Sequence, residues 1–256
     1  MKYHSVAEAR TMKGLRLVLT AYMPGPWGEA AKYIFGARNV PFVPVEQLAM
    51  ETNDDLFAWT GMRNAPIAMY EDEPPQSTWL EILLLAERIG SGPSLIPEDP
   101  IDRALMMGIS TELCSPDGFA WSRRLELMGR SDVQRPADRN YDIARMTRSY
   151  GVNPETIARA PKRMISIMQG LARQLHQQKA AGSDYLVGKQ LSACDLHWAA
   201  FAGFVSPLPP ELCPMPDFMR HNYSGLTPEL ADALDPILLE HRDRVYERHI
   251  ELPMDF

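Results

Sequence analysis

The clear strand-forming segments of this 256-residue chain lie in its first seventy residues. They are three short apolar runs, at residues 15–20, 42–45 and 67–70. A helical pattern at 27–38 separates the first two runs, and such a strand–helix–strand unit implies a right-handed crossover and a parallel strand pair. Pro44 lacks a backbone N–H group, so the second strand is expected at a sheet edge. The pattern predicts a small α/β domain at 15–90 with a mixed sheet.

The rest of the chain has helical patterns and almost no strand signals. A helix opening at Ser77 or Thr78 and closing at Gly90 ends the first domain. A connector rich in Gly and Pro follows at 91–100 and marks the domain boundary. An all-helical domain is expected at 101–256, with helices at 101–113, 117–129, 154–180, 193–204 and 227–248. The polar residues 1–14 are expected to form a loose N-terminal arm, and a short fourth strand is possible at 71–75.

Composition excludes several classes of function. The net charge of −7 gives no electrostatic reason to bind nucleic acid or an anionic membrane. No apolar stretch approaches the ~20 residues that span a bilayer, and the N-terminus lacks the apolar run of a signal peptide. We therefore expect a soluble, cytoplasmic protein.

The residues that commonly bind metals are few and scattered. The three cysteines, at 114, 194 and 213, form neither a disulfide framework nor a zinc motif, and we expect free thiols. None of the six histidines lies in an H-x-x-x-H or H-E-x-x-H pattern, so no metal site is expected. His197, within an apolar helix, is expected to be a hydrogen-bonded core residue.

Four motifs occur in an order and spacing that resemble the glutathione transferases. Tyr22-Met23-Pro24 follows the first strand, where tyrosine-type members place the hydroxyl that faces the glutathione sulfur. Asn64-Ala65-Pro66-Ile67 is similar to the loop that carries a cis-proline before the third strand. Gln76-Ser77 resembles the pair that holds the γ-glutamyl end of glutathione. The segment 185–195 resembles the loop and Ser-x-x-Asp capping box, here Ser192 and Asp195, before a buried helix.

The resemblance implies a thioredoxin-like N-terminal domain, an all-helical C-terminal domain and glutathione as co-substrate. Tyr22 would stabilise the thiolate, the backbone of Ala65 beside Pro66 would pair with the peptide, and Gln76 and Ser77 would bind its carboxylate at a helix N-terminus. Trp27, Met106, Met107 and Ser110 are candidates for the pocket of a small apolar electrophile. The family also implies a homodimer, while Ser192 and Asp195 would be structural.

Other interpretations stay open from the residues alone. Tyr22 also fits a half-buried tyrosine at a strand end, Trp27 a packing aromatic, and Gln76-Ser77 a plain helix cap. A binder without catalysis fits Gly25 and Gly28, which stand where other classes have Ser or Cys. An isomerase, dehalogenase or ether-cleaving enzyme on the same fold fits equally, because fold does not determine reaction.

Overall fold

The computed structural model describes residues 1–130, 132, 147–148 and 150–256. These residues form two compact units. The first contains Met1–Leu95 together with Pro210–Met215 and Leu252–Phe256, and the second contains Ile96–Pro209 and Pro216–Glu251. Two short segments of the expected helical domain 101–256 therefore pack with the N-terminal unit.

The N-terminal unit is built on a three-stranded mixed sheet. Its strands are β1 (Leu15–Thr20), β2 (Val43–Gln47) and β3 (Ile67–Tyr70), in the order β2-β1-β3. β1 pairs in parallel with β2 and antiparallel with β3, with Val18 opposite Val45 and Ile67. β2 is an edge strand, as Pro44 predicts. The possible fourth strand is reduced to an isolated bridge between Ala68 and Gln76.

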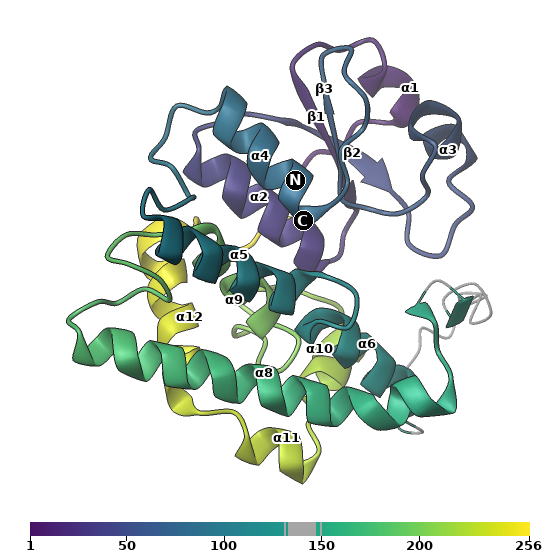
Figure 1. The fold of residues 1–256 in the computed structure, drawn as a ribbon. Helices are drawn as coiled ribbons and strands as arrows, with labels where there is room; N and C mark the ends of the chain where they lie inside the picture. The colour runs from purple at the N-terminus through teal and green to yellow at the C-terminus, as the bar shows by residue number, and fades with distance from the viewer. Residues whose placement is uncertain (131, 133–146, 149) are drawn as a thin grey trace. The chain divides into compact units, whose positions relative to one another are not determined.

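Helices cover both faces of this sheet (Figure 1). The helices of the unit are α1 (Val6–Ala9), α2 (Pro26–Ala37), α3 (Asp54–Thr60) and α4 (Trp79–Ile89). α1 and α3 share one core cluster with Val18, Val45 and Ile67. Side chains alternate along a strand, so Leu19 points to the sheet face opposite Val18. A Cβ atom added to Gly28 of α2 would lie 3.2 Å from Cδ2 of Leu19. Close packing of α2 on β1 thus explains Gly28 without any catalytic role.

The N-terminal segment is not the loose arm that its polarity predicts. The backbone of His4 forms a parallel bridge with Val45, donating to Pro44 O at 2.9 Å and accepting from Glu46 N at 3.0 Å. Ser5 caps α1, and Val6 of that helix is buried in the core cluster. Two strand-like hydrogen bonds and two buried apolar residues, Val6 and Ala9, hold a segment that has no periodicity of its own.

The second unit consists of helices and loops, with no strand among its described residues. Its helices are α5 (Pro100–Cys114), α6 (Phe119–Gly129), α8 (Pro154–Ala180), α9 (Ala193–Ala202), α10 (Asp217–Ser224), α11 (Pro228–Asp232) and α12 (Pro236–His249). All ten residues of α9 are buried, and α9 packs against α5 and α12, so its expected central position is confirmed. The single helix expected at 227–248 is wrong: Asp235-Pro236 begins a new helix, because proline disfavours helix at the preceding residue.

A buried arginine ties α6 to distant segments of this unit. Arg123 is fully buried, and its NH1 group lies 2.5 Å from Glu126 Oε2. The rest of its guanidinium donates to four backbone carbonyl oxygens, those of Phe204, Asn222, Tyr223 and Gly225. Burial raises the pKa of the Glu126 carboxyl, with the Arg123 charge opposing it. The arginine therefore links α6 to the segment after α9 and to the C-terminal end of α10.

Candidate functional site

Tyr22 lies in the turn that follows β1. The pairing of β1 with β2 extends to Ala21, whose N–H donates to Gln47 O at 3.0 Å. Tyr22 then adopts a left-handed backbone with φ of 63°, which is uncommon for a non-glycine residue. Its side chain is 61% exposed. The half-buried strand-end alternative is therefore wrong, and the turn presents a phenol to solvent.

Ala65 lies at the same end of the sheet as Tyr22. Ile67 pairs with Val18, so continuing the antiparallel register places Ala65 opposite Thr20, two residues before Tyr22. The Ala65–Pro66 peptide bond is cis, the geometry that the resemblance implies. Among the described residues, the backbone of Ala65 makes no hydrogen bond with another backbone group. An extended ligand chain therefore has a backbone donor and acceptor beside Tyr22.

Gln76 and Ser77 lie beside β3, immediately before α4. Ala68 and Gln76 exchange two backbone hydrogen bonds, of 2.7 and 3.0 Å. The N-cap of α4 is Thr78, whose hydroxyl accepts from Glu81 N at 3.2 Å. Ser77 is therefore not the cap but the residue before it. This bridge pairs Gln76 with Ala68, which follows Pro66 by two residues. The start of α4 is therefore brought close to the Pro66 end of β3.

The N-terminus of α4 already has a carboxylate partner. Glu81 Oε2 accepts from Ser77 N at 3.0 Å and from Thr78 N at 2.9 Å. These bonds, that from Thr78 first, hold the pKa of Glu81 below its ordinary value. A second carboxylate, Glu73, lies 3.5 Å from Gln76 Nε2 and is paired with Arg88 at 2.5 Å. A ligand carboxylate at this helix N-terminus would therefore compete with Glu81 for the backbone N–H groups of Ser77 and Thr78.

Trp27 is the second residue of α2 and is partly buried. Two residues further on, Glu29 is buried and pairs with Lys32 at 2.9 Å. Burial raises the pKa of Glu29, and the Lys32 charge opposes that shift. Lys32 also donates to Asp255 O at 2.6 Å, so this ion pair attaches the C-terminal segment to α2.

The candidates on α5 divide between core and surface. Met106 and Ser110 are fully buried, and the Ser110 hydroxyl lies 3.6 Å from Met106 Sδ and 3.0 Å from His197 Nδ1. Ser110 thus packs inside the helical unit, and the place of both side chains in a ligand pocket stays a prediction. Met107 is partly exposed and stays a prediction. His197 is a hydrogen-bonded core residue, as expected, and burial lowers its pKa to about 3.

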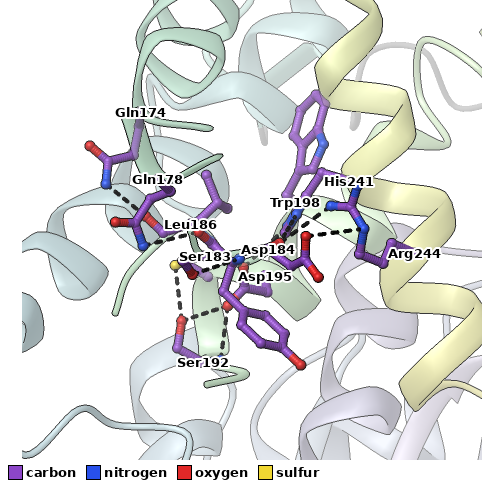
Figure 2. Close-up of polar contacts among 12 residues, drawn as sticks. Gln174, Gln178, Ser183, Asp184, Leu186, Ser192, Asp195, Trp198, His241 and Arg244 are labelled. Carbon is purple, nitrogen blue, oxygen red and sulfur yellow. Dashed lines mark hydrogen bonds and ion pairs between the residues drawn. The ribbon is translucent and has the colours of Figure 1, made fainter. Parts of the chain in front are cut away.

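The capping box at α9 has the expected form (Figure 2). Asp195 Oδ2 accepts from the backbone N–H of Ser192 at 2.9 Å and from its hydroxyl at 2.8 Å, while Oδ1 accepts from Leu186 N at 2.8 Å. His241 of α12 adds a contact that the motif does not include: its Nε2 lies 3.1 Å from Asp195 Oδ1. All of these groups are buried. Asp195 therefore connects the loop at Leu186 with helices α9 and α12 and has a structural role, away from the exposed candidate site.

Two residues of the site were not identified from the sequence. Glu81 was readable, because Thr78-x-x-Glu81 is a capping-box pattern. Tyr3 was not, since its contact with Tyr22 joins residues far apart along the chain. The three cysteines are buried thiols outside any disulfide, and burial raises the pKa of Cys114 and Cys194. Within the described part of the chain there is no cluster of potential metal ligands and no helix suited to crossing a bilayer.

Comparison with known proteins shows similarity in structure only. No protein-family model matches the sequence, and no curated protein is similar to it in sequence. A glutathione S-transferase from Methylobacterium radiotolerans, solved in complex with glutathione sulfonate, superposes with a TM-score of 0.62 at 18% identity, covering 91% of each chain. A glutathione S-transferase domain-containing protein from Marinobacter aquaeolei VT8 gives 0.63 at 16%, covering 92% of this chain and 100% of that one. The beta-etherase LigF from Sphingobium sp. strain SYK-6 gives 0.58 at 17%, covering 90% and 99%.

These matches span nearly the whole of each chain, including the small mixed sheet and the buried helix α9. At such low sequence identity they establish the fold but not the reaction, which has to be argued from the residues of the site. The chain has the glutathione S-transferase fold, a thioredoxin-like α/β domain followed by an all-helical domain.

Proposed function

We propose that the chain binds glutathione on its N-terminal unit and uses Tyr22 to stabilise the thiolate for attack on a small apolar electrophile. The observation that carries the proposal is that Tyr22, the unpaired backbone of Ala65 and the Gln76-Ser77 segment are brought by β1 and β3 to one end of the sheet. The neighbour solved with glutathione sulfonate supports the choice of ligand.

Each group has a defined task in this proposal. The backbone of Ala65 pairs with the cysteinyl part of glutathione as an added strand does. Ser77 and Gln76 hold the γ-glutamyl carboxylate where the helix dipole of α4 favours negative charge. The Tyr22 hydroxyl donates to the sulfur, which favours the thiolate, the nucleophilic form. Sulfur then forms a bond to carbon of the electrophile as a leaving group departs or a double bond accepts the electron pair.

Calorimetric titration with glutathione tests the binding site. Ser77→Ala should weaken binding, and Ser91→Ala, which removes an exposed hydroxyl of the same unit, is the matched control. Absence of binding in wild type, or equal affinity in wild type and Ser77→Ala, would refute the assignment.

Tyr22→Phe tests catalysis separately from binding. Loss of one hydrogen bond to a charged sulfur costs about 1.5–3 kcal/mol, so kcat/KM with a model electrophile should fall roughly 10–100-fold. A variant as active as wild type would favour a binder without catalysis. Ether cleavage is the second candidate reaction, because the beta-etherase shares the fold, and β-aryl ethers belong in the electrophile panel.

The expected homodimer also belongs to this proposal. Size-exclusion chromatography with light scattering decides it, and a mass near 28.9 kDa would exclude the dimer.

A further inference from the structure

The N-terminal segment carries an aromatic residue to the candidate sulfur site. The bridge of His4 to Val45 fixes the backbone one residue after Tyr3. From there the Tyr3 ring reaches the Tyr22 ring, with centroids 5.6 Å apart and planes inclined at 67°. This edge-to-face geometry is the favourable arrangement for two aromatic rings.

Tyr22 needs an external support of this kind. Its side chain is 61% exposed, so contacts within the turn restrict its rotamer little. A hydroxyl that donates to a ligand sulfur must be held within a narrow range of directions. Contact with a ring anchored to the sheet restricts the Tyr22 phenol in that way.

The Tyr3 hydroxyl itself does not explain why a tyrosine is present. Its oxygen is buried and has no hydrogen-bond partner among the described residues. Burial raises the pKa of this phenol above its ordinary value, with the charges of Glu29 and Tyr22 adding to the shift. An unpaired buried hydroxyl costs folding free energy, so the ring is the part of the side chain that contributes.

We propose that Tyr3 is a positioning residue: its ring, anchored through the His4–Val45 bridge, holds the Tyr22 phenol toward the ligand sulfur. This inference rests on the proposed function of Tyr22. Tyr3 touches neither ligand nor reacting atoms in this role and acts through Tyr22 alone.

The test compares Tyr3→Phe, which keeps the ring and removes the unpaired hydroxyl, with Tyr3→Ala and Tyr3→Leu, which remove the ring. The readout is the pKa of glutathione bound to the full-length protein, followed by thiolate absorbance against pH. Tyr3→Ala and Tyr3→Leu should raise that pKa toward the value in Tyr22→Phe, and Tyr3→Phe should match wild type. In the Tyr22→Phe background, Tyr3→Ala should have no further effect, because the two changes act through one group.

Three results would overturn the proposal. One is an unchanged thiol pKa in Tyr3→Ala and Tyr3→Leu while Tyr22→Phe raises it. Another is an equal effect of Tyr3→Ala in both backgrounds, which makes Tyr3 independent of Tyr22. The third is a Tyr3→Phe variant as impaired as Tyr3→Ala, which would make the hydroxyl a direct donor.

A measurement without ligand separates this inference from the proposed function. Nitration of Tyr22, mapped by mass spectrometry in the apo protein, should be faster in Tyr3→Ala and Tyr3→Leu than in wild type and Tyr3→Phe. Equal rates in all four proteins would refute the positioning role even if glutathione binds. Faster nitration in a protein that fails to bind glutathione would leave the positioning intact and remove the proposed function.

Discussion

Replacing Glu81 with glutamine should tighten glutathione binding. Glu81 Oε2 accepts from the backbone N–H groups of Ser77 and Thr78, at 3.0 and 2.9 Å, at the helix N-terminus assigned to the ligand carboxylate. The ligand must therefore share or displace a negative charge that the chain supplies. In Glu81→Gln one oxygen still accepts a hydrogen bond, but the like-charge repulsion is gone.

The magnitude follows from the exposure of the site. Two carboxylates about 4 Å apart repel by about 1 kcal/mol in a water-like dielectric, and Glu81 is exposed. Relief of about 1 kcal/mol corresponds to roughly fivefold tighter binding. The same substitution removes a favourable charge–dipole interaction and should lower the free energy of unfolding by about 0.3–1 kcal/mol. Affinity and stability are thus expected to move in opposite directions.

Calorimetric titration and thermal unfolding of wild type, Glu81→Gln and Asp72→Asn measure both effects. Asp72→Asn is the control: it also removes one negative charge, but from a residue that follows the C-terminal end of β3 and pairs with Lys13. The pKa of Glu81 is lowered, so its stabilising contribution is present above its unfolded pKa and lost only as the pH falls through the folded value. The affinity gain should therefore be constant from pH ~6 to ~8. Weaker or unchanged binding in Glu81→Gln, or an equal gain in Asp72→Asn, would refute the competition.

Three further predictions concern the helical unit, each read from chemical unfolding. Asp195→Ala leaves the buried N–H groups of Leu186 and Ser192 without their acceptor, removes the carboxylate beside His241, and should lower the free energy of unfolding by about 3–5 kcal/mol. Arg123→Met should cost about as much, because the buried Glu126 loses its 2.5 Å partner and keeps the more distant Arg130 at 3.8 Å. Adding Glu126→Met should recover part of the loss; no recovery would mean that the ion pair is not the cause. His197 has a pKa of about 3 when folded and 6.5 as its ordinary value, so stability falls as the pH drops below 6.5. Between pH 7 and 5 wild type should lose about 2 kcal/mol through this group, and a His197→Asn variant that loses as much would contradict the assignment.

The elements that the sequence predicts well are those whose signals are local. The three strands and the long helix α8 follow from apolar periodicity and from Pro or Asn at their ends, and their bounds differ little from expectation. Helix α10 was not predicted, because its apolar residues follow a cluster of prolines that reads as an extended loop. The bridge at His4 was missed for a different reason: an isolated backbone pair needs no side-chain pattern at all.

The candidate site was predictable only in part. Tyr22, Ala65 and Ser77 were identified by their order along the chain, and the register of β1 and β3 brings their segments to one end of the sheet. Met106 and Ser110 could not be placed, since an apolar or small residue on a helix fits a core and a pocket equally well. Burial bears on that choice, and for Ser110 it depends on how α9 packs against α5.

Two groups of residues should respond differently to substitution: the buried charged residues of the helical unit, and the exposed or partly exposed groups of the candidate site. In the helical unit, Arg123 and Asp195 satisfy backbone groups from distant segments at full burial, so their loss should change stability first. Around Tyr22 and Ser77 the groups are exposed or partly exposed and held by short turns, so substitution there should change ligand binding with little effect on unfolding. A variant of Ser77 that lost binding through global unfolding would break this division. Unfolding measurements on the site variants are therefore part of the functional argument, because they determine whether a lost activity reports the site or the scaffold.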